Sequence, residues 1–424
     1  MPLKNRIRVY EYDFLSVGTE YEGVKYTATL HKKLAQYLTQ NQRCGYYTVL
    51  YNRIRFLNYV GAIQVDGFTI EVLPKTDRSD ASKESWQRIL IEMLHISRQV
   101  EAKTTTLANI NMRELNVLET YLQMFLAETE KLLHNGLVKK YRTQSGNQKT
   151  IKGKLLINQH ISQNMVHAER FYVSYQIYDR DNLYNRVIYE ALKCIHSLSL
   201  SMATTQWCSR LMLDFPECTD LKVSEELFSR IIFDRKTARY ESAIDLARII
   251  LLHYHPDVRG GDNHILAIMF DMNKLWESYV YAMLIRANRE ADHKVEILAQ
   301  RRQSFWRHYD GWSLGLIPDI IVKKGGKNII IDTKWKYRRD TSIEDVRQLY
   351  AYGKYFNSKR RCLLYPEKSE TGIKKSNYYA ETNYSTRGDG IDTEERCDLM
   401  FVDILNEDGK LNKTIGAEIL RLVL

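Results

Sequence analysis

The sequence predicts a mixed α/β protein with a β-rich N-terminal part, a helical middle region and a C-terminal central mixed sheet flanked by helices. Three observations support this prediction: a strand-like pair around Asp66-Gly67, long stretches with apolar residues three and four positions apart, and a second strand-like pair around Gly325-Gly326. A chain of 424 residues, 44% of them hydrophobic, is long and apolar enough for two or three structural units.

The first strand-like pair lies near the N-terminus. Residues 55–65 and 68–73 are rich in branched and aromatic side chains, and Asp66-Gly67 separates them. Because both positions of a tight hairpin turn need positive φ, an Asp-Gly pair between two such runs predicts a β-hairpin. We therefore interpret residues 1–76 as a small β-rich unit.

The middle of the chain is mainly helical by its periodicity. Helices are predicted over 84–100, 114–133, 181–203 and 224–253. The polar stretch 141–150 predicts an exposed loop, 151–157 a short strand, and 256–263, with Gly260-Gly261, a linker. We divide the chain into a β-rich and helical domain at 1–165, a helical connecting region at 166–255, and a C-terminal domain at 256–424.

Composition limits the classes of protein that remain. The net charge of +10 favours a polyanionic partner such as nucleic acid. The six cysteines include no C-x-x-C pair, so we expect neither a zinc site nor a disulfide framework, and a cytoplasmic location fits. We expect no export signal and no membrane span. The sequence holds no G-x-x-x-x-G-K-[ST] phosphate loop, so a nucleotide-driven motor would be another polypeptide.

The most informative chemistry lies in residues 316–335, which read as two strands joined by Gly325-Gly326. Side chains alternate between the two faces of a strand, so Asp332 and Lys334, two residues apart, lie on the same face. Pairing across the hairpin brings Asp319 near them. Two converging carboxylates repel unless a cation lies between them, and oxygen ligands favour Mg²⁺ or Mn²⁺. The alternative is that Asp319 is a turn residue and that Asp332 and Lys334 form an ordinary ion pair.

Pro318-Asp319 followed by Asp332-Thr333-Lys334 resembles the signature of the PD-(D/E)xK nuclease superfamily. The resemblance implies a metal-binding glutamate on a preceding helix, which Glu277 would supply. It also implies a helix after the Asp-x-Lys strand, and residues 343–356 carry a Gln348-x-x-x-Tyr352 element similar to that of RecB-like nucleases. Otherwise Glu277 is a solvated helix residue, and Gln348 and Tyr352 belong to an ordinary amphipathic face.

The resemblance also implies roles for these residues in phosphodiester hydrolysis. Glu277, Asp319 and Asp332 would bind Mg²⁺, with the backbone carbonyl of Thr333 as an extra ligand. Lys334 would assist the attacking water, while Gln348 and Tyr352 would position the site or the phosphate. Residues 361–365 would form the next core strand.

Within the superfamily the chain is most similar to the McrC family, the nuclease subunits of McrBC restriction systems that attack DNA with modified cytosine. The similar stretches are 59–65, 69–75, 151–154, 181–186, 272–280 and the core through Phe356. The family implies an AAA+ GTPase ring, McrB, as partner and double-stranded DNA as substrate. Residues 1–165 would dock in the ring and stimulate its GTPase. The alternatives are a RecB-like repair nuclease without a motor and a non-catalytic GTPase activator.

Two basic segments flank the expected site and mix positive charge with aromatic rings, 301–308 and 358–361. The candidate DNA-binding residues are Arg301, Arg302, Lys336, Arg360 and Arg361. The alternative for each is a solvated edge. His253-x-His255 reads as structural, since no third metal ligand lies near it in the sequence, and Arg387–Gly390 as a turn.

Overall fold

The computed structural model describes residues 6–40, 45–65, 68–74, 83–99, 117–167, 169–198, 200–256, 264–291, 295–336, 341–367, 371–379, 391–406 and 408–424. The predicted mixed α/β class is confirmed, with several separate sheets and helices between them. No helix among these described residues is both long and apolar enough to cross a membrane. The expected linker and the Arg387–Gly390 turn lie outside the described residues, as do the side chains of His253 and His255.

A five-stranded sheet lies beneath the N-terminus. Its order is β1 (Arg6–Tyr10), β8 (Phe68–Leu73), β7 (Tyr59–Val65), β13 (His264–Asp271) and β12 (Tyr254–Pro256). The predicted hairpin is confirmed, because β7 and β8 are antiparallel with Val65 opposite Phe68. Smaller elements cover this sheet: β2 (Phe14–Ser16), β6 (Arg53–Phe56) and β5 (Tyr47–Leu50) in one sheet, β3 (Glu20–Tyr21) with β4 (Val24–Lys25), and α1 (Ala28–Gln40).

The boundary expected at residue 256 does not separate two sheets. β12 before it and β13 after it pair with each other, and β13 pairs with β7 along its length. A local reading of the Gly-Gly stretch could not reveal this pairing, because the partner strand is about two hundred residues away in the chain. The last strand of the N-terminal sheet thus leads directly into the helix that begins the C-terminal part.

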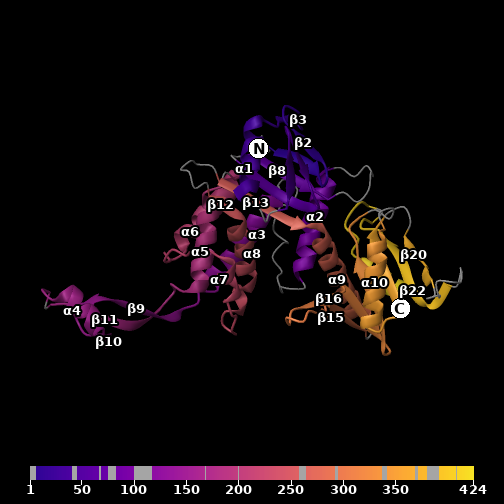
Figure 1. The fold of residues 1–424 in the computed structure, drawn as a ribbon. Helices are drawn as coiled ribbons and strands as arrows, with labels where there is room; N and C mark the ends of the chain where they lie inside the picture. Colours follow the sequence, from indigo (N-terminus) through magenta and orange to yellow (C-terminus); the bar gives the residue numbers. More distant parts are fainter. Residues whose placement is uncertain are drawn as a thin grey trace.

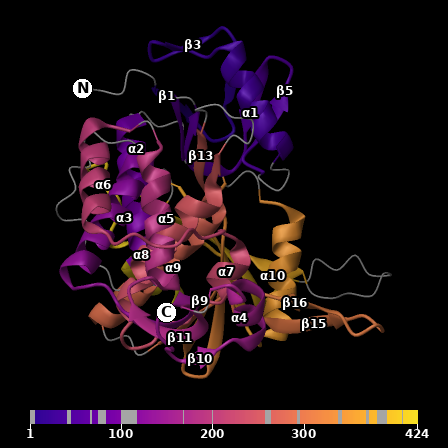
Figure 2. The same ribbon diagram turned by 90° about the vertical axis from the view of Figure 1, so that its left-hand side faces the viewer.

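The helical middle region packs against the lower face of this sheet (Figures 1 and 2). Its helices are α2 (Lys83–Gln99), α3 (Val117–His134), α5 (Leu183–His196), α6 (Met202–Asp214), α7 (Glu225–Ser229) and α8 (Glu241–His253). Two predicted helices are wrong in extent. The segment 181–203 contains two helices instead of one: α5 ends at His196, and Ser201 caps the start of α6. The segment 224–253 is broken near Asp234, whose carboxylate accepts from the backbone of Lys236 and Thr237 in a turn.

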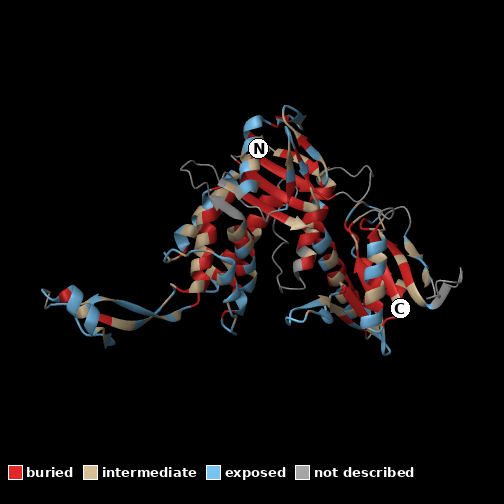
Figure 3. Cartoon of the chain, in the orientation of Figure 1, coloured by how far each residue is buried: buried red, intermediate tan, exposed pale blue. Residues whose placement is uncertain are grey.

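A long arm extends from the helical region (Figure 1). It consists of β9 (Lys140–Gln148), β10 (Lys154–Leu155), α4 (Ile157–Asn164) and β11 (Phe171–Asp179), and most of its surface is exposed (Figure 3). The loop predicted over 141–150 is wrong, because β9 pairs with β11 from Lys140–Asp179 to Gln148–Phe171. A ribbon exposed on both faces has no buried side to impose an apolar alternation on its sequence.

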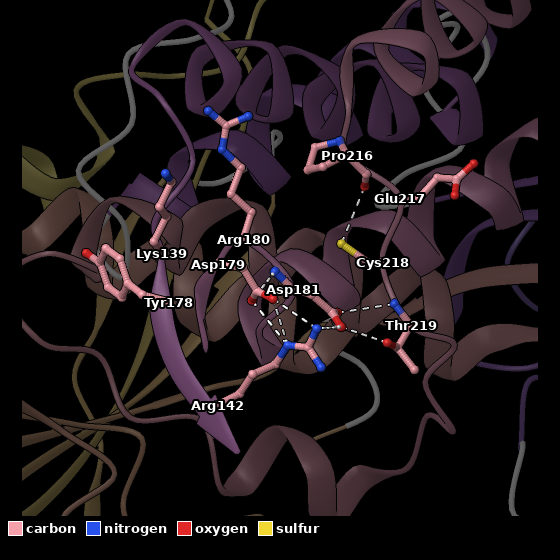
Figure 4. A pocket seen from close by; sticks show the side chains of 10 residues that line it. All are labelled: Lys139, Arg142, Tyr178, Asp179, Arg180, Asp181, Pro216, Glu217, Cys218 and Thr219. Atoms are coloured by element: carbon pink, nitrogen blue, oxygen red, sulfur yellow. Dashed lines mark hydrogen bonds and ion pairs between the residues drawn. The ribbon is translucent and has the colours of Figure 1, made fainter. Parts of the chain in front are cut away.

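The stretch 181–186 fixes the base of this arm. Asp181 forms a bidentate pair with Arg186, at 2.6 and 2.9 Å. Asn182 and Asn185 both donate to the carbonyl oxygen of Val138, just before β9 begins. These polar residues therefore tie both strands of the arm to the start of α5. A pocket of about 650 Å³ lies beside them (Figure 4), lined by Lys139, Arg142, Tyr178, Asp179, Arg180, Asp181, Pro216, Glu217, Cys218 and Thr219.

The C-terminal sheet is mixed, as predicted. Its order is β14 (Glu296–Ala299), β17 (Ile320–Lys324), β18 (Lys327–Thr333), β19 (Arg360–Pro366), β22 (Ile391–Val402) and β20 (Gly372–Lys374), with β21 (Asn377–Tyr379) also on β22. The strands β18, β19 and β22 are parallel, and the other pairs are antiparallel. A separate hairpin, β15 (Gln303–Arg307) with β16 (Ser313–Leu316), lies between β14 and β17 in the chain.

Alternate residues of these strands enter two different cores. Ile331, Cys362 and Leu364 pack with α9 (Met272–Ala291) and α11 (Ile415–Val423) on one face. Ile330 and Leu363 pack with α10 (Ile343–Tyr355) on the other. The helix expected to carry Glu277, the helix predicted over 343–356 and the strand predicted over 361–365 are confirmed. The sheet thus carries helices on both faces, and its strand ends meet α10 at the candidate site.

Candidate active site

The two aspartates lie opposite each other across a hairpin. β17 begins directly after Asp319, and its antiparallel register pairs Ile320 with Ile331 of β18. One step further along, Asp319 lies opposite Asp332. The expectation that hairpin pairing brings these carboxylates together is confirmed by this register, and both stand at the end of a buried strand pair.

Asp319 is fixed by the residue that follows Asp332. Its Oδ2 accepts hydrogen bonds from the backbone nitrogen of Thr333 at 2.7 Å and from the Thr333 hydroxyl at 2.8 Å. Burial raises the pKa of Asp319 even though these two bonds favour its charged form. Thr333 thus orients the Asp319 carboxylate through its backbone and side chain.

Asp332 is almost fully buried, with 1% of its surface exposed. Burial, followed by the charge of Asp319, raises the pKa of Asp332 to about 7. Its Oδ2 makes no hydrogen bond of good geometry, although the Nζ of Lys334 lies 2.7 Å away as an ion pair. The two carboxylates therefore hold more negative charge than the surrounding protein offsets.

Lys334 links this charge to helix α10. Its Nζ lies 3.5 Å from a carboxylate oxygen of Asp345 and donates to the Oε1 of Gln348 at 3.5 Å. Burial alone would lower the pKa of Lys334, but the charges of Asp332 and Asp345 outweigh it and raise that pKa. The ammonium group is therefore charged at neutral pH and fixed between a strand and a helix.

Gln348 and Tyr352 share a face of α10, as their spacing predicts. The Gln348 amide donates to the Tyr352 hydroxyl at 2.5 Å, and this hydroxyl donates to the carbonyl oxygen of Ile317 at 3.0 Å. Since Ile317 lies two residues before Asp319, the pair connects the Lys334 ammonium to the start of the β17–β18 hairpin. These bonds join Lys334 to Ile317 through the two side chains.

Glu277 approaches the aspartates from helix α9. Burial and then the charge of Asp319 raise the pKa of Glu277 to about 6, which places it within electrostatic reach of Asp319. Its Oε1 accepts from the side chain of Gln300 at 2.5 Å. The charge of Asp319 thus disfavours ionisation of both Glu277 and Asp332.

The donor set fits a hard divalent cation in charge and atom type. Three carboxylates with raised pKa values, Asp332 buried and Glu277 and Asp319 partly buried, gain most from a cation, and Mg²⁺ prefers such oxygen donors. They are not arranged as a finished metal cage: among the described residues, no three His, Cys, Asp or Glu side chains converge in this way. Glu277 is directed at Gln300, and Asp319 at Thr333.

Two predicted DNA-binding residues have structural partners instead, and for these the prediction is corrected. Arg361 is fully buried, donates to the carbonyl oxygen of Ser358 and pairs with Glu395, so it cannot contact DNA. Arg360 donates to the last carbonyls of α11 at 2.6 and 2.8 Å and pairs with Asp398. A basic run next to a strand does not reveal which of its side chains point inward.

The other three predicted DNA-binding residues lie at the surface. Lys336 pairs with Asp345 at 2.5 Å, with 29% of its side chain exposed. Arg301 and Arg302 are exposed beside β15. Only this last pair keeps the exposure that contact with a phosphate backbone requires.

Sequence reasoning missed two side chains that hold the site together, Asp345 and Gln300. Asp345 carries a detectable signal, because Ser342-x-x-Asp345 is a capping box, and both bonds of the box are present at the start of α10. Gln300 carries no such signal. It precedes the β15–β16 hairpin, and only the fold brings it to Glu277.

The N-terminal unit contacts the residues that follow strand β18 directly. The indole nitrogen of Trp335, one residue after Lys334, donates to the buried Oε1 of Glu11 at 2.7 Å. Trp335 also packs against Trp276 of α9, with ring centroids 5.7 Å apart. The backbone nitrogen of Met272, at the start of α9, donates to the carbonyl oxygen of Asn58. The elements carrying Lys334 and Glu277 both rest on residues from the first sixty of the chain.

Comparison with known proteins identifies the family. The sequence model of the McrBC 5-methylcytosine restriction system component family matches residues 54–366. The match covers well over half of the chain, so the protein belongs to this family of restriction system components. The McrC-like nature predicted from the sequence is confirmed.

Two solved structures from Thermococcus gammatolerans are similar. The first is described as a refined half-complex from the tetradecameric assembly of McrB AAA+ hexamers with bound McrC; it has a TM-score of 0.66 and 19% identity, and covers 99% of this chain and 99% of that one. The second is a cryo-EM structure of the McrBC complex, with a TM-score of 0.48, 22% identity and coverage of 67% and 88%. The first shows that the fold is shared. No match was found among curated proteins.

Proposed function

We propose that this chain is the magnesium-dependent DNA endonuclease subunit of a McrBC-like, modification-dependent restriction system, and that it also stimulates the GTPase of an AAA+ ring. The nuclease part rests on one observation above the others: the partly buried Asp319 lies opposite the buried Asp332, with the Lys334 ammonium 2.7 Å from Asp332. This arrangement is what hydrolysis of a phosphodiester by a metal-assisted water needs.

Each residue would contribute separately to the reaction. Glu277, Asp319 and Asp332 would hold Mg²⁺, with Mn²⁺ as a substitute and the carbonyl oxygen of Thr333 as a further ligand. The ion would supply a nucleophilic water and offset charge on the phosphate. The Lys334 ammonium lies beside Asp332, at the edge of the three carboxylates. There it would orient the water and stabilise the negative charge that develops on the phosphate.

Helix α10 would keep Lys334 in place during this reaction. Gln348 accepts from Lys334 and donates to Tyr352, which in turn is bound to the Ile317 carbonyl. Burial raises the pKa of Tyr352 to about 12, so its hydroxyl keeps the proton that this bond needs at neutral pH. Gln348 and Tyr352 are accordingly positioning residues.

The arm is the best-supported surface for docking to a ring. The arm consists of the last part of the 1–165 segment that we expect to dock and of the return strand β11. It extends away from the body of the molecule (Figures 1 and 3). At its tip Ile157 and Ile161 stand one helical turn apart on α4 and are exposed, as are Met165 and Val166. An exposed apolar stripe on a projecting element is typical of a protein-docking surface. The similar McrC is described as bound to McrB AAA+ hexamers.

The nuclease proposal is tested with the full chain, an AAA+ GTPase of the McrB type, GTP, Mg²⁺ and a plasmid carrying modified cytosine. Asp332→Asn and Lys334→Met should each lower cleavage at least a hundredfold and leave GTPase stimulation unchanged. Asp220→Asn, at an exposed carboxylate, is the matched control. Unchanged cleavage by Asp332→Asn would refute the nuclease site.

The docking proposal is tested with Ile157→Asp/Ile161→Asp. This variant should lose ring binding and GTPase stimulation while its unfolding transition stays that of the parent, because both side chains are exposed. Cleavage with Mg²⁺ alone and no ring binding by the parent would favour the RecB-like repair nuclease. GTPase stimulation without any cleavage would favour the non-catalytic activator.

A further inference from the structure

The connection between β14 and β17 leaves the sheet beside the candidate site. These strands are antiparallel partners, with Ala299 opposite Ile320, so residues 300–319 join them. The backbone nitrogen of Gln300 donates to the carbonyl oxygen of Asp319 at 3.0 Å and closes the base of this connection. The β15–β16 hairpin therefore starts next to the partner of Glu277 and ends at Asp319. Figures 1 and 2 show it projecting from the C-terminal sheet.

Large aromatic side chains crowd this hairpin without entering a core. Trp306 and Trp312 contact edge to face at 4.9 Å, and Trp312 stacks on His308 at 5.0 Å, which in turn contacts Tyr309. Trp306 remains 44% exposed, Trp312 52% and Tyr309 91%. We call Trp306, His308, Tyr309 and Trp312 the ring cluster. Its rings are held in place by one another, and their outer faces are open to solvent.

The hairpin is also basic. Residues 300–318 contain three arginines, Arg301, Arg302 and Arg307, and one acidic residue, Asp310. Asp310 lies against His308 at 3.2 Å. All three arginines are exposed, and within the described part of the chain none forms an ion pair. Aromatic faces surrounded by guanidinium groups that form no ion pair fit a polyanion with flat, apolar surfaces.

The orientation of the hairpin toward the site is fixed. Phe305 packs edge to face on Tyr355 of α10 at 5.1 Å, and Ile317 accepts from Tyr352 one turn earlier on this helix. Five residues of extended strand reach about 16 Å, which is roughly half of a B-DNA turn. A duplex with one phosphate at Asp319 and Asp332 would therefore meet the ring cluster within half a turn of the cut.

We propose that the β15–β16 hairpin is a sequence-independent grip on duplex DNA beside the cleavage position. Arg301 and Arg307 bind phosphates, and the ring cluster packs into the adjacent groove against sugars and base edges. This inference rests on the proposed function, because it takes duplex DNA as the substrate of the nearby site. It assigns no base specificity to the chain, since phosphate contacts and ring packing are tolerant of sequence.

The test measures binding of a fluorescent duplex to the full-length chain that carries Asp332→Asn, so that no cleavage intervenes. Trp306→Ala/Trp312→Ala should weaken binding at least tenfold. Arg301→Ala/Arg307→Ala should lower the slope of log K against log salt by about 2, one for each phosphate that the variant no longer neutralises. Tyr51→Ala and Arg230→Ala change exposed residues elsewhere and should leave binding unchanged.

The possible outcomes separate this inference from the proposed function. Parent-like duplex binding by both hairpin variants, or no duplex binding by the Asp332→Asn chain itself, overturns the grip. If the hairpin variants change sedimentation or binding to the AAA+ ring while their affinity for the duplex is unchanged, the DNA grip is also overturned. The hairpin is then a protein interface. If the wild-type chain never cuts DNA but duplex binding still depends on the hairpin, the nuclease proposal fails and the grip stands.

Discussion

Replacing Asp332 by asparagine should stabilise the metal-free protein at pH 8 while abolishing cleavage. The pKa of Asp332 is raised from 3.8 to about 7 in the folded chain, mainly by burial and then by Asp319. A folded-state pKa above the unfolded one means that the favourable contribution is present below pH 3.8 and is lost as the pH rises through 7. About three pKa units correspond to roughly 4 kcal/mol at pH 8. Asparagine keeps the shape of the neutral acid and avoids this cost.

The free energy of unfolding is measured with denaturant in EDTA, at pH 8 and pH 5, for the wild type, Asp332→Asn and the control Asp220→Asn. For a chain of 424 residues that unfolds as one unit, 4 kcal/mol raises the Tm by about 4 °C. At pH 5 the advantage should fall to roughly 1–2 kcal/mol, because the folded wild type is then protonated at Asp332. Asp332→Asn equal to or less stable than the wild type at pH 8 would refute the claim that the two carboxylates carry uncompensated charge.

Two further predictions concern stability away from the carboxylates. A Cβ at position 353 would overlap the guanidinium of the buried Arg361, so Gly353→Ala should lower the free energy of unfolding in denaturant by roughly 2–4 kcal/mol. Gly146→Ala, where a Cβ meets open space, should lower it little. Equal losses in the two variants would contradict the close contact. Glu11→Leu leaves the Trp335 indole unpaired and should cost about 1–3 kcal/mol, while Glu11→Gln keeps an acceptor and should recover most of it; equal losses in the two variants would show that this hydrogen bond stabilises nothing.

Local patterns in the sequence determined the β17–β18 hairpin and helix α10. The aliphatic runs around Gly325-Gly326 can only bury themselves as paired strands, and strand pairing then sets Asp319 opposite Asp332. The spacing of Gln348 and Tyr352 placed them on one helix face, where they bond to each other. These predictions depend only on neighbours within a few residues or across one turn, which the order of residues specifies.

Contacts between distant segments were decided by the tertiary structure alone. The strand β9 of the arm could not be predicted from its own sequence, because a ribbon with two exposed faces needs no apolar pattern. Its extended conformation depends on pairing with β11, more than twenty residues later in the chain. Arg361 lies in a basic run like those of DNA-binding surfaces, yet the close approach of Gly353 and the partner Glu395 buries it. Glu11 reaches Trp335 across most of the chain. In each case burial and partner choice depend on which surfaces pack together, and this information is distributed over the whole chain rather than held in any one stretch.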